Sequence, residues 1–493
     1  MDWISICIAV VTAGLALLLW LKPSRPKNSP PGPPAIPMFG SFHFFAKQPH
    51  IALLKTKEKY GDTYMIHVGR RPVVILSNYN TVKKVFGDDL VSGRDNESYI
   101  RYDASTLAES GLIFSEGDLW KTHRRFALST LRDLGMGKNW LEDTIIGEVD
   151  AIIQRIRGTN KTPFNPKVQL TNSVSNVICA LIFGQRFSLD DPNFSQLTNL
   201  ITENIASLPY DQIALTLPFL MWFPNPIRAQ IMSARNNLAK LNVFMSARIE
   251  EHKSADRRTD VEDYLHAYQT EKETGNKTDK AAQATFDETQ LLASLFDLFA
   301  AGTETTSTTT LWAFVFMVEY PHIMRKVQEE IDSTVGREKM LTNSDRALLP
   351  YTEAVILEVQ RCASLVPLGA PHRARDEITV DGYTIPKNAI IFANLFSIHR
   401  DPRWWKNPEI FDPERFLDGN GKLTRPDGFA PFSVGKRACL GEALAKMELF
   451  LFIANLLRCF TLELPKGKTI SHDDYISSVV NSPKPYELIF VPR

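Results

Sequence analysis

The chain has 493 residues, 44% of them hydrophobic, and its 56 basic and 56 acidic side chains give a formal net charge of zero. This length provides material for a large core, and the balanced charge excludes a partner that is recognised by overall charge, such as nucleic acid. Five scattered cysteines without a Cys-x-x-Cys pair exclude a disulfide framework and a clustered zinc or iron–sulfur site, and favour a reducing compartment.

The amino terminus carries 19 residues without a charge, 3–21, which is long enough to span a bilayer. One acidic residue, Asp2, precedes this segment, and three basic residues follow it: Lys22, Arg25 and Lys27. A cleaved signal peptide, the alternative, would have the reverse charge order and a shorter apolar stretch. The sequence therefore predicts a transmembrane signal anchor over residues 1–21, with the following residues in the cytosol.

A proline-rich segment follows the predicted anchor, with seven prolines among residues 23–37. Proline favours extended, semi-rigid backbone, so residues 22–37 are predicted to be a stiff linker. A ligand for a proline-binding module is the alternative. Residues 38–493 contain no second linker and no repeat, which predicts one large domain.

Two short segments of this domain are predicted to be β-structure. Residues 64–76 have the pattern of a strand, a turn and a strand. Residues 377–386 place Asp381-Gly382 between two β-prone runs, which indicates a hairpin. Most of the remainder is predicted to be helical, and the polar residues 252–284 to be a solvated loop with short helices.

The longest predicted helix begins at a capping box formed by Thr285 and Glu288 and ends at Glu319, before Pro321. Its apolar pattern is interrupted by residues 301–310, AGTETTSTTT. The threonines of this stretch have two interpretations. They line a polar functional surface, or their hydroxyls bond to carbonyls four residues earlier and bend the helix.

Near the carboxyl terminus, a glycine-containing loop leads through Cys439 into an amphipathic helix. A helix amino terminus favours the thiolate form of a cysteine. Gly435 and Gly441 would allow a flat group to approach, and Arg437 could bind an anion. An inert buried cysteine and ordinary surface charge are the alternatives.

Five collinear motifs resemble those of the cytochrome P-450 family, closest to the animal microsomal enzymes that oxidise drugs, fatty acids and steroids. The motifs are Trp120-Lys-Thr-His-Arg124, Ala301-Gly-Thr-Glu-Thr305, Glu358-Val-Gln-Arg361, Pro413-Glu-Arg-Phe416 and Phe432-x-x-Gly-x-Arg-x-Cys-x-Gly441. The resemblance covers essentially the whole chain. It implies the cytochrome P-450 fold, mainly α with small β-sheets, as a single large haem domain behind the membrane anchor.

The resemblance implies that Cys439 is the axial thiolate ligand of haem b, an iron protoporphyrin IX. Seven other residues are implied to contact the haem or bind its propionates: Trp120, Arg124, Ala301, His372, Phe432, Arg437 and Gly441. Glu358 and Arg361, three apart on a helix, are implied to form a structural lock with Arg415. Many relatives also place an arginine about a dozen residues before Trp120, but residues 107–114 contain none, so propionate binding is expected to be weaker or rearranged.

Thr305 and Glu304 are implied to be the catalytic pair. Activating dioxygen requires two electrons and two protons, and a dry apolar pocket supplies no protons. The Thr305 hydroxyl would donate a hydrogen bond to the dioxygen that is being activated. Glu304 would take protons from water and pass them inward. The small residues Ala301 and Gly302 would leave room for oxygen and let the helix widen locally.

The chain has no flavin- or nicotinamide-binding signature, so electrons are expected from a separate NADPH-dependent flavoprotein reductase, with cytochrome b5 as a further possible donor. Four basic residues could form the docking face for an acidic reductase: Lys121, Arg125, Arg132 and Lys436. A solvated charged face is the alternative. The resemblance implies a single-pass protein of the endoplasmic reticulum membrane.

The predicted function is insertion of one oxygen atom from O2 into a lipophilic substrate, which could be a xenobiotic, a fatty acid or a steroid. By analogy, residues 100–116, 204–215, 296–301, 365–370 and 479–480 would bound that substrate. The aromatic segment 216–226 could enter the membrane or pack against a neighbour. A reductase-independent isomerase or dehydratase and a haem-based sensor are the alternatives, and the Glu304–Thr305 pair argues against both.

Overall fold

The computed structural model describes Trp3, Cys7, Thr12 and residues 25–41, 48–100, 109–135, 139–254, 263–275 and 280–493. The predicted anchor over residues 1–21 therefore lies almost wholly outside the described residues. In the part of the chain that is described, no helix combines the length and apolar character needed to cross a bilayer.

The domain is mainly helical, as the sequence predicts. Its helices are α2 (Pro49–Tyr60), α3 (Tyr79–Phe86), α4 (Gly117–Asp133), α5 (Asn139–Gly158), α6 (Lys167–Phe183), α7 (Pro192–Thr216), α8 (Pro226–Ser254), α9 (Tyr264–Thr274), α10 (Lys280–Ala284), α11 (Glu288–Glu319), α12 (Pro321–Thr334), α13 (Pro350–Ala363), α14 (Leu395–Ile398) and α15 (Glu442–Cys459). Its strands are β1 (Thr63–Val68), β2 (Arg71–Leu76), β3 (His372–Arg373), β4 (Ile378–Val380), β5 (Tyr383–Ile385), β6 (Ile390–Ala393), β7 (Phe460–Glu463), β8 (Tyr475–Ile476), β9 (Ser482–Pro483) and β10 (Ile489–Pro492).

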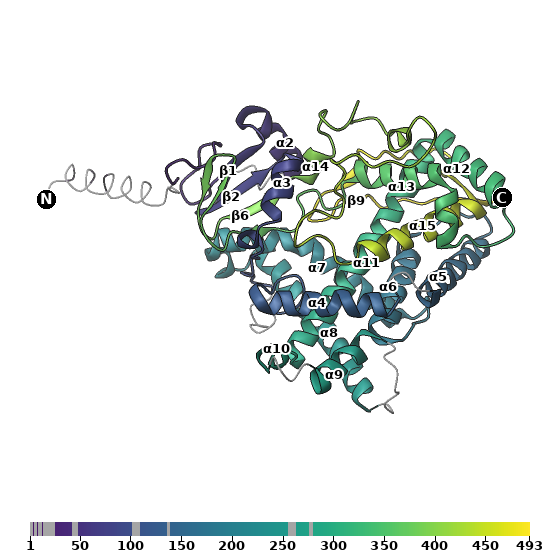
Figure 1. The fold of residues 1–493 in the computed structure, drawn as a ribbon, viewed down its shortest axis with the longest axis horizontal. Helices are drawn as coiled ribbons and strands as arrows, with labels where there is room; N and C mark the ends of the chain where they lie inside the picture. The colour runs from purple at the N-terminus through teal and green to yellow at the C-terminus, as the bar shows by residue number, and fades with distance from the viewer. Residues whose placement is uncertain are drawn as a thin grey trace.

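The largest sheet has the order β1-β2-β6-β3 and lies with α2 and α3 at the end of the molecule opposite the carboxyl terminus (Figure 1). β1 and β2 are antiparallel, with Thr63 opposite Leu76, so the predicted strand–turn–strand is confirmed. The predicted hairpin is β4–β5. Its turn residues Asp381 and Gly382 have φ of 51° and 82°, the left-handed pair that a two-residue hairpin turn requires.

The described part of the proline-rich segment, residues 25–37, packs on the domain and is not a free spacer. The Arg25 side chain donates to the carbonyl of Met65 in β1 at 3.0 Å, and the Met65 N–H donates to the Pro31 carbonyl at 2.8 Å. A Cβ at Gly32 would lie 1.9 Å from the Met65 carbonyl oxygen, so only glycine fits there. The folded unit thus begins before residue 38, because backbone groups of the linker pair with β1.

Helix α11 passes through the middle of the molecule (Figure 1) and packs against α6, α13 and α15. Its end at Glu319 is confirmed, but the predicted capping box is wrong. The N-cap is Asp287, whose carboxylate accepts the free N–H of Gln290 at 2.7 Å, while Thr285 donates to the carbonyl of Ala282. A carboxylate next to the first turn satisfies the exposed N–H groups better than a hydroxyl two residues earlier.

The helix is α-helical throughout, so the structure does not contain the local widening suggested by the small residues of 301–302. Gly302 has a different role. A Cβ at this position would lie 2.5 Å from Cδ1 of Ile178 in α6. Glycine therefore lets α6 and α11 approach closely.

The segment 252–284 is more than a solvated loop. Tyr264 and Tyr268 of α9 are buried, and their rings lie 5.5 and 5.7 Å from that of Phe126 in α4, with Phe286 completing the cluster. Their spacing of four residues puts both rings on one helix face, which the polar surroundings concealed in the sequence.

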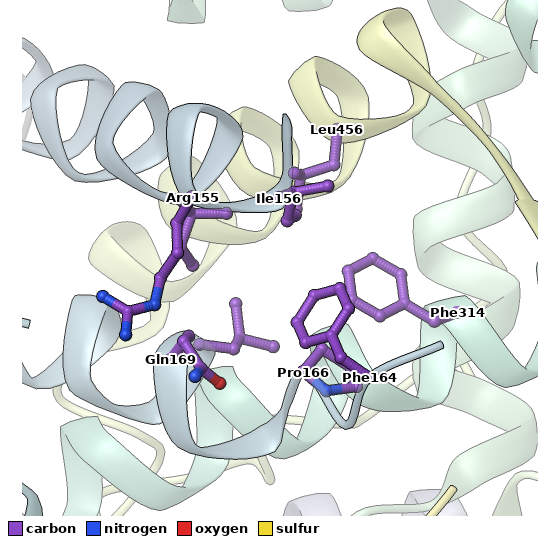
Figure 2. Close-up of a pocket in the computed structure, with 9 residues that line it drawn as sticks. Arg155, Ile156, Phe164, Pro166, Gln169, Phe314 and Leu456 are labelled. Carbon is purple, nitrogen blue, oxygen red and sulfur yellow. The ribbon is translucent and has the colours of Figure 1, made fainter. Parts of the chain in front are cut away.

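A cavity of about 10 Å³ lies among α5, α6, α11 and α15, and Figure 2 shows the rings of Phe164 and Phe314 side by side at its edge. This volume is at the lower limit for one water molecule, so the cavity is a packing gap. Phe314, which lines the cavity, lies nine residues beyond Thr305, roughly 13 Å along the helix, so the cavity is remote from that threonine.

We expect Asp287→Ala to loosen the first turn of α11 by about 1 kcal/mol, because its carboxylate caps Gln290. Hydrogen exchange of the amides in residues 288–292 should accelerate about fivefold. Glu288→Ala, which removes only the predicted capping-box acid, is the control. An equal acceleration in the control would contradict Asp287 as the cap.

Candidate active site

The predicted ligand Cys439 lies just before α15, whose N-cap is Gly441. Its N–H donates to the Phe432 carbonyl at 2.9 Å, and this bond closes the loop. Although the side chain keeps accessible surface, the surrounding protein raises the pKa of the thiol, while the N–H of Gly441 and Arg124 act in the opposite direction. The helix terminus and Arg124 thus favour the thiolate, while burial opposes it.

The two loop glycines have different reasons to be glycine. Gly435 has φ of 85°, and a Cβ there would lie 2.2 Å from the Phe86 carbonyl oxygen at the end of α3. It is therefore required by the protein and not by an approaching ligand, contrary to expectation. Gly441 has no atom within 4 Å of the position that a Cβ would take, so this side of the loop stays open to a bound group.

Trp120 of α4 lies between two of the predicted arginines. The Arg437 guanidinium lies 3.9 Å from the centre of the indole ring and that of Arg124 lies 5.8 Å from it. Arg124 also donates to the Ala438 carbonyl at 2.5 Å, next to Cys439. The indole Nε1 is buried without a hydrogen-bond partner. The structure thus brings Trp120, Arg124, Arg437 and Cys439 together.

A third guanidinium, that of Arg94, was missed by the sequence analysis. It is buried and donates to the carbonyls of Pro371 at 2.8 Å and Ile113 at 3.2 Å. Its charge and that of Arg124 repel Arg437, and together with burial they lower the Arg437 pKa to about 8. Burial, reinforced by Arg124, lowers the pKa of Arg94 to about 10.

No described carboxylate lies within ion-pair distance of Arg94, Arg124 or Arg437. Two buried cations, Arg94 and Arg437, and the half-buried Arg124 close to them without an anion favour an anionic ligand. Arg94 also supplies a cation although residues 107–114 have none. No motif spacing revealed it, because its neighbours come from segments distant in the sequence.

His372 is buried with its ring stacked on Phe86, 3.7 Å between centres, and its Nδ1 is 2.8 Å from the Val91 carbonyl. Because a carbonyl only accepts, Nδ1 carries the proton. Burial and then Arg94 hold the pKa of this imidazole far below its usual range. The neutral ring thus has no Nε2 proton, and the expected donation to a propionate requires the imidazolium form.

The three residues of the predicted lock meet as expected. Arg361 binds Glu358 through two bonds of 2.7 Å, and Arg415 donates to Glu358 at 3.0 Å. Glu358 and Arg361 are fully buried. Arg361 also donates to the His399 carbonyl at 2.8 Å, and the His399 ring accepts the N–H of Ala430 at 3.1 Å. This chain of bonds links α13 to the start of the Cys439 loop.

Several hydroxyls of the polar stretch in α11 bond back to the helix, as the second interpretation predicts. Thr305 donates to the Ala301 carbonyl at 2.8 Å, and Ser307, Thr309 and Thr310 bond back in the same way.

Three other side chains of the stretch bind neighbouring helices. Thr303 accepts from Ser175 of α6 at 3.1 Å, Glu304 accepts from Thr202 of α7 at 2.6 Å, and Thr306 donates to Glu448 of α15 at 3.1 Å. These contacts account for a polar patch inside a core helix.

One stripe of α11 remains accessible near the polar stretch, while Phe299, Thr303 and Glu304 beside it are buried. Leu298, Ala301, Gly302 and Thr305 form this stripe, at the three- and four-residue spacing of one helix face. Thr306 to Met317 are buried again. The accessible surface therefore ends with the predicted catalytic threonine.

The predicted reductase-docking face is partly neutralised. Arg125 and Arg132 are exposed, but Lys121 and Lys436 both lie next to Asp89, at 3.9 and 2.7 Å. The aromatic segment after α7 is exposed as expected, with 74% of Trp222 and 60% of Phe223 accessible.

These groups fit haem b, which carries two carboxylates. The fit rests on two buried guanidiniums and a half-buried one, an indole N–H without a partner, the open side of Gly441 and a thiol just before α15. Of the three guanidiniums, those of Arg124 and Arg437 were expected from the sequence to bind the haem propionates.

Comparison with known proteins agrees with this geometry. Residues 30–490 match the family "Cytochrome P450", so the chain belongs to that family and is an enzyme of the haem-thiolate monooxygenase class. Similar proteins include mouse cytochrome P450 2J5 (36% identical, covering 99% of this chain and 96% of the relative), human cytochrome P450 2J2 (37%, 96% and 93%) and mouse cytochrome P450 2B19 (35%, all of both chains).

We expect Glu358→Gln to destabilise the fold by about 3–5 kcal/mol, because two buried guanidiniums would lose their shared anion. Thermal unfolding should begin several degrees lower, with loss of bound haem. Asp474→Asn, which breaks the exposed pair with Lys484, is the control and should cost less than 1 kcal/mol. Equal melting temperatures for the two variants would contradict the lock.

Proposed function

We propose that this protein inserts one oxygen atom from O2 into a lipophilic substrate, with electrons from NADPH delivered by a separate reductase. The cluster of Arg94, Arg124 and Arg437, with the Trp120 ring against the last two and Cys439 next to Arg124, is the observation that carries the proposal. Buried cations and a buried donor of this kind call for a dicarboxylate ligand, and the thiol next to them for a metal. Haem b meets both demands.

In this proposal Cys439 would ligate the haem iron, the arginines with Trp120 would bind the propionates, and the neutral ring of His372 would contact the haem. Phe432 closes the ligand loop through its carbonyl, Gly441 leaves space for the macrocycle, and Ala301 faces it from α11. Glu358, Arg361 and Arg415 fix the loop. When bound, haem supplies the redox chemistry, with a thiolate that favours O–O cleavage.

The residues of α11 are proposed to manage protons. Thr305 lies at the end of the accessible stripe, where its hydroxyl can exchange its bond to the Ala301 carbonyl for one to the reacting oxygen. Glu304 is buried beside it and is the nearest acid in the sequence, so it is proposed to supply the proton. The apolar residues around the stripe exclude other water, which limits wasteful reduction.

The protein is proposed to be anchored in the endoplasmic reticulum membrane by residues 1–21, with the domain in the cytosol. The exposed Trp222 and Phe223 are proposed to contact the lipid and admit lipophilic substrate. Arg125 and Arg132, together with Lys121 and Lys436 beside Asp89, are proposed to meet an acidic reductase, with cytochrome b5 as a second donor.

Cys439→Ser should abolish the long-wavelength Soret band that the reduced protein gives under carbon monoxide, because an anionic sulfur ligand produces it. Cys459→Ser, at the far end of α15, is the matched control and should keep the band. If haem-replete wild type lacks the band, the proposed function is wrong.

Glu304→Gln and Thr305→Ala should each lower the product formed per NADPH by roughly tenfold or more, since a positioned proton donor is worth at least that factor. The excess electrons should appear as hydrogen peroxide. The control is Thr310→Val, which loses only a bond to the Thr306 carbonyl. Unchanged coupling in both site variants would contradict the proton-delivery role.

A further inference from the structure

The Glu304 carboxylate accepts a hydrogen bond from helix α7, which has no part in the proton delivery proposed for Glu304 and Thr305. The Thr202 hydroxyl on α7 donates to Oε2 of Glu304 at 2.6 Å, and Thr308 donates to Oε1 at a longer 3.3 Å. Glu304 is buried, and no described basic side chain lies within ion-pair distance of it. Thr202 therefore makes the shorter of the two side-chain bonds that hold this carboxyl.

The stretch of α7 around Thr202 is fixed from both sides. One turn earlier, Thr198 donates to Asn172 of α6 at 3.0 Å, and the adjacent Glu203 accepts from Asn237 of α8 at 2.8 Å. The position of the Thr202 hydroxyl is thus set by the packing of α7 between α6 and α8. A change in that packing would move the donor and with it the Glu304 carboxyl.

Thr305, in contrast, holds its hydroxyl on the Ala301 carbonyl at 2.8 Å. Glu304, its proposed partner in proton delivery, is instead directed towards α7 by the bond from Thr202, in which Thr305 takes no part. The orientation of Glu304 depends on α7, and α7 includes residues 204–215 that the sequence analysis places along the substrate.

We propose that Thr202 is a positioning residue for Glu304, which makes proton delivery depend on the position of α7. This inference rests on the proposed function. Productive turnover combines RH, O2, two electrons and two protons into ROH and water, whereas the failed reaction combines O2, two electrons and two protons into hydrogen peroxide. Misplacing Glu304 shifts electrons from the first reaction to the second.

The test compares full-length variants reconstituted with an NADPH-dependent reductase, with 7-ethoxycoumarin as a lipophilic probe. The fraction of NADPH electrons recovered as peroxide is measured, together with product, the dissociation constant of the probe and the melting temperature. Thr202→Val keeps the shape but removes the hydroxyl, and should lower the ratio of water-forming to peroxide-forming turnover by roughly threefold or more. Thr202→Ser keeps a hydroxyl and should restore the wild-type ratio.

The matched control is Thr310→Val, which removes a hydroxyl that bonds only to the Thr306 carbonyl and does not touch Glu304 or α7. It should lower the melting temperature and leave the ratio unchanged. In a double-mutant cycle, Thr202→Val should have no further effect in a Glu304→Gln background, because the group it positions is gone. Binding of the probe should change less than twofold in Thr202→Val.

The inference is overturned if Thr202→Val is folded and partitions electrons as the wild type does while Glu304→Gln does not. It is also overturned if Thr202→Val and Glu304→Gln act additively. If Glu304→Gln itself leaves the partition unchanged, the failure lies in the proposed function and the role of Thr202 falls with it.

Discussion

The guanidinium groups of Arg94, Arg124 and Arg437 lie close together, the first and last buried and that of Arg124 half-buried. The rest of the active site depends on how their charge is compensated. Backbone carbonyls hold Arg94, Arg124 and Arg437 in place but carry no net charge to offset theirs. Burial and mutual repulsion lower the pKa of Arg437 to about 8. The charge of a dianionic ligand would offset both effects, so binding the proposed haem would also stabilise this half of the fold.

In the Glu358 cluster, by contrast, a side chain of the protein itself compensates the charge of the buried arginines. Here two guanidiniums surround one carboxylate, and the remaining N–H groups reach carbonyls of the segment before Pro413. The cluster is complete within the protein, so it fixes geometry and needs no ligand. One arginine group is thus self-sufficient and structural, while the other is left for a bound anion.

Helix α11 shows how a core helix accommodates polar residues without losing burial. Thr303, Glu304 and Thr306 of this helix each meet a different neighbour: Ser175 of α6, Thr202 of α7 and Glu448 of α15. Because buried polar groups are costly unless paired, these contacts also fix the rotation of α11. That rotation presents Ala301 and Thr305 on the accessible stripe.

The sequence by itself determined the family motifs, the mainly helical fold, the β1–β2 and β4–β5 hairpins and the pairing of Glu358 with Arg361, because each depends on residues close in the chain. Tertiary structure alone decided the role of Arg94, the carbonyl contact that requires Gly435, the burial of Tyr264 and the hold of Thr202 on Glu304. It also moved the cap of α11 to Asp287 and packed residues 25–37 on β1. Local patterns encode periodicity and spacing, but the desolvation of a charge and the partner of a buried hydroxyl depend on which distant segments the fold brings together.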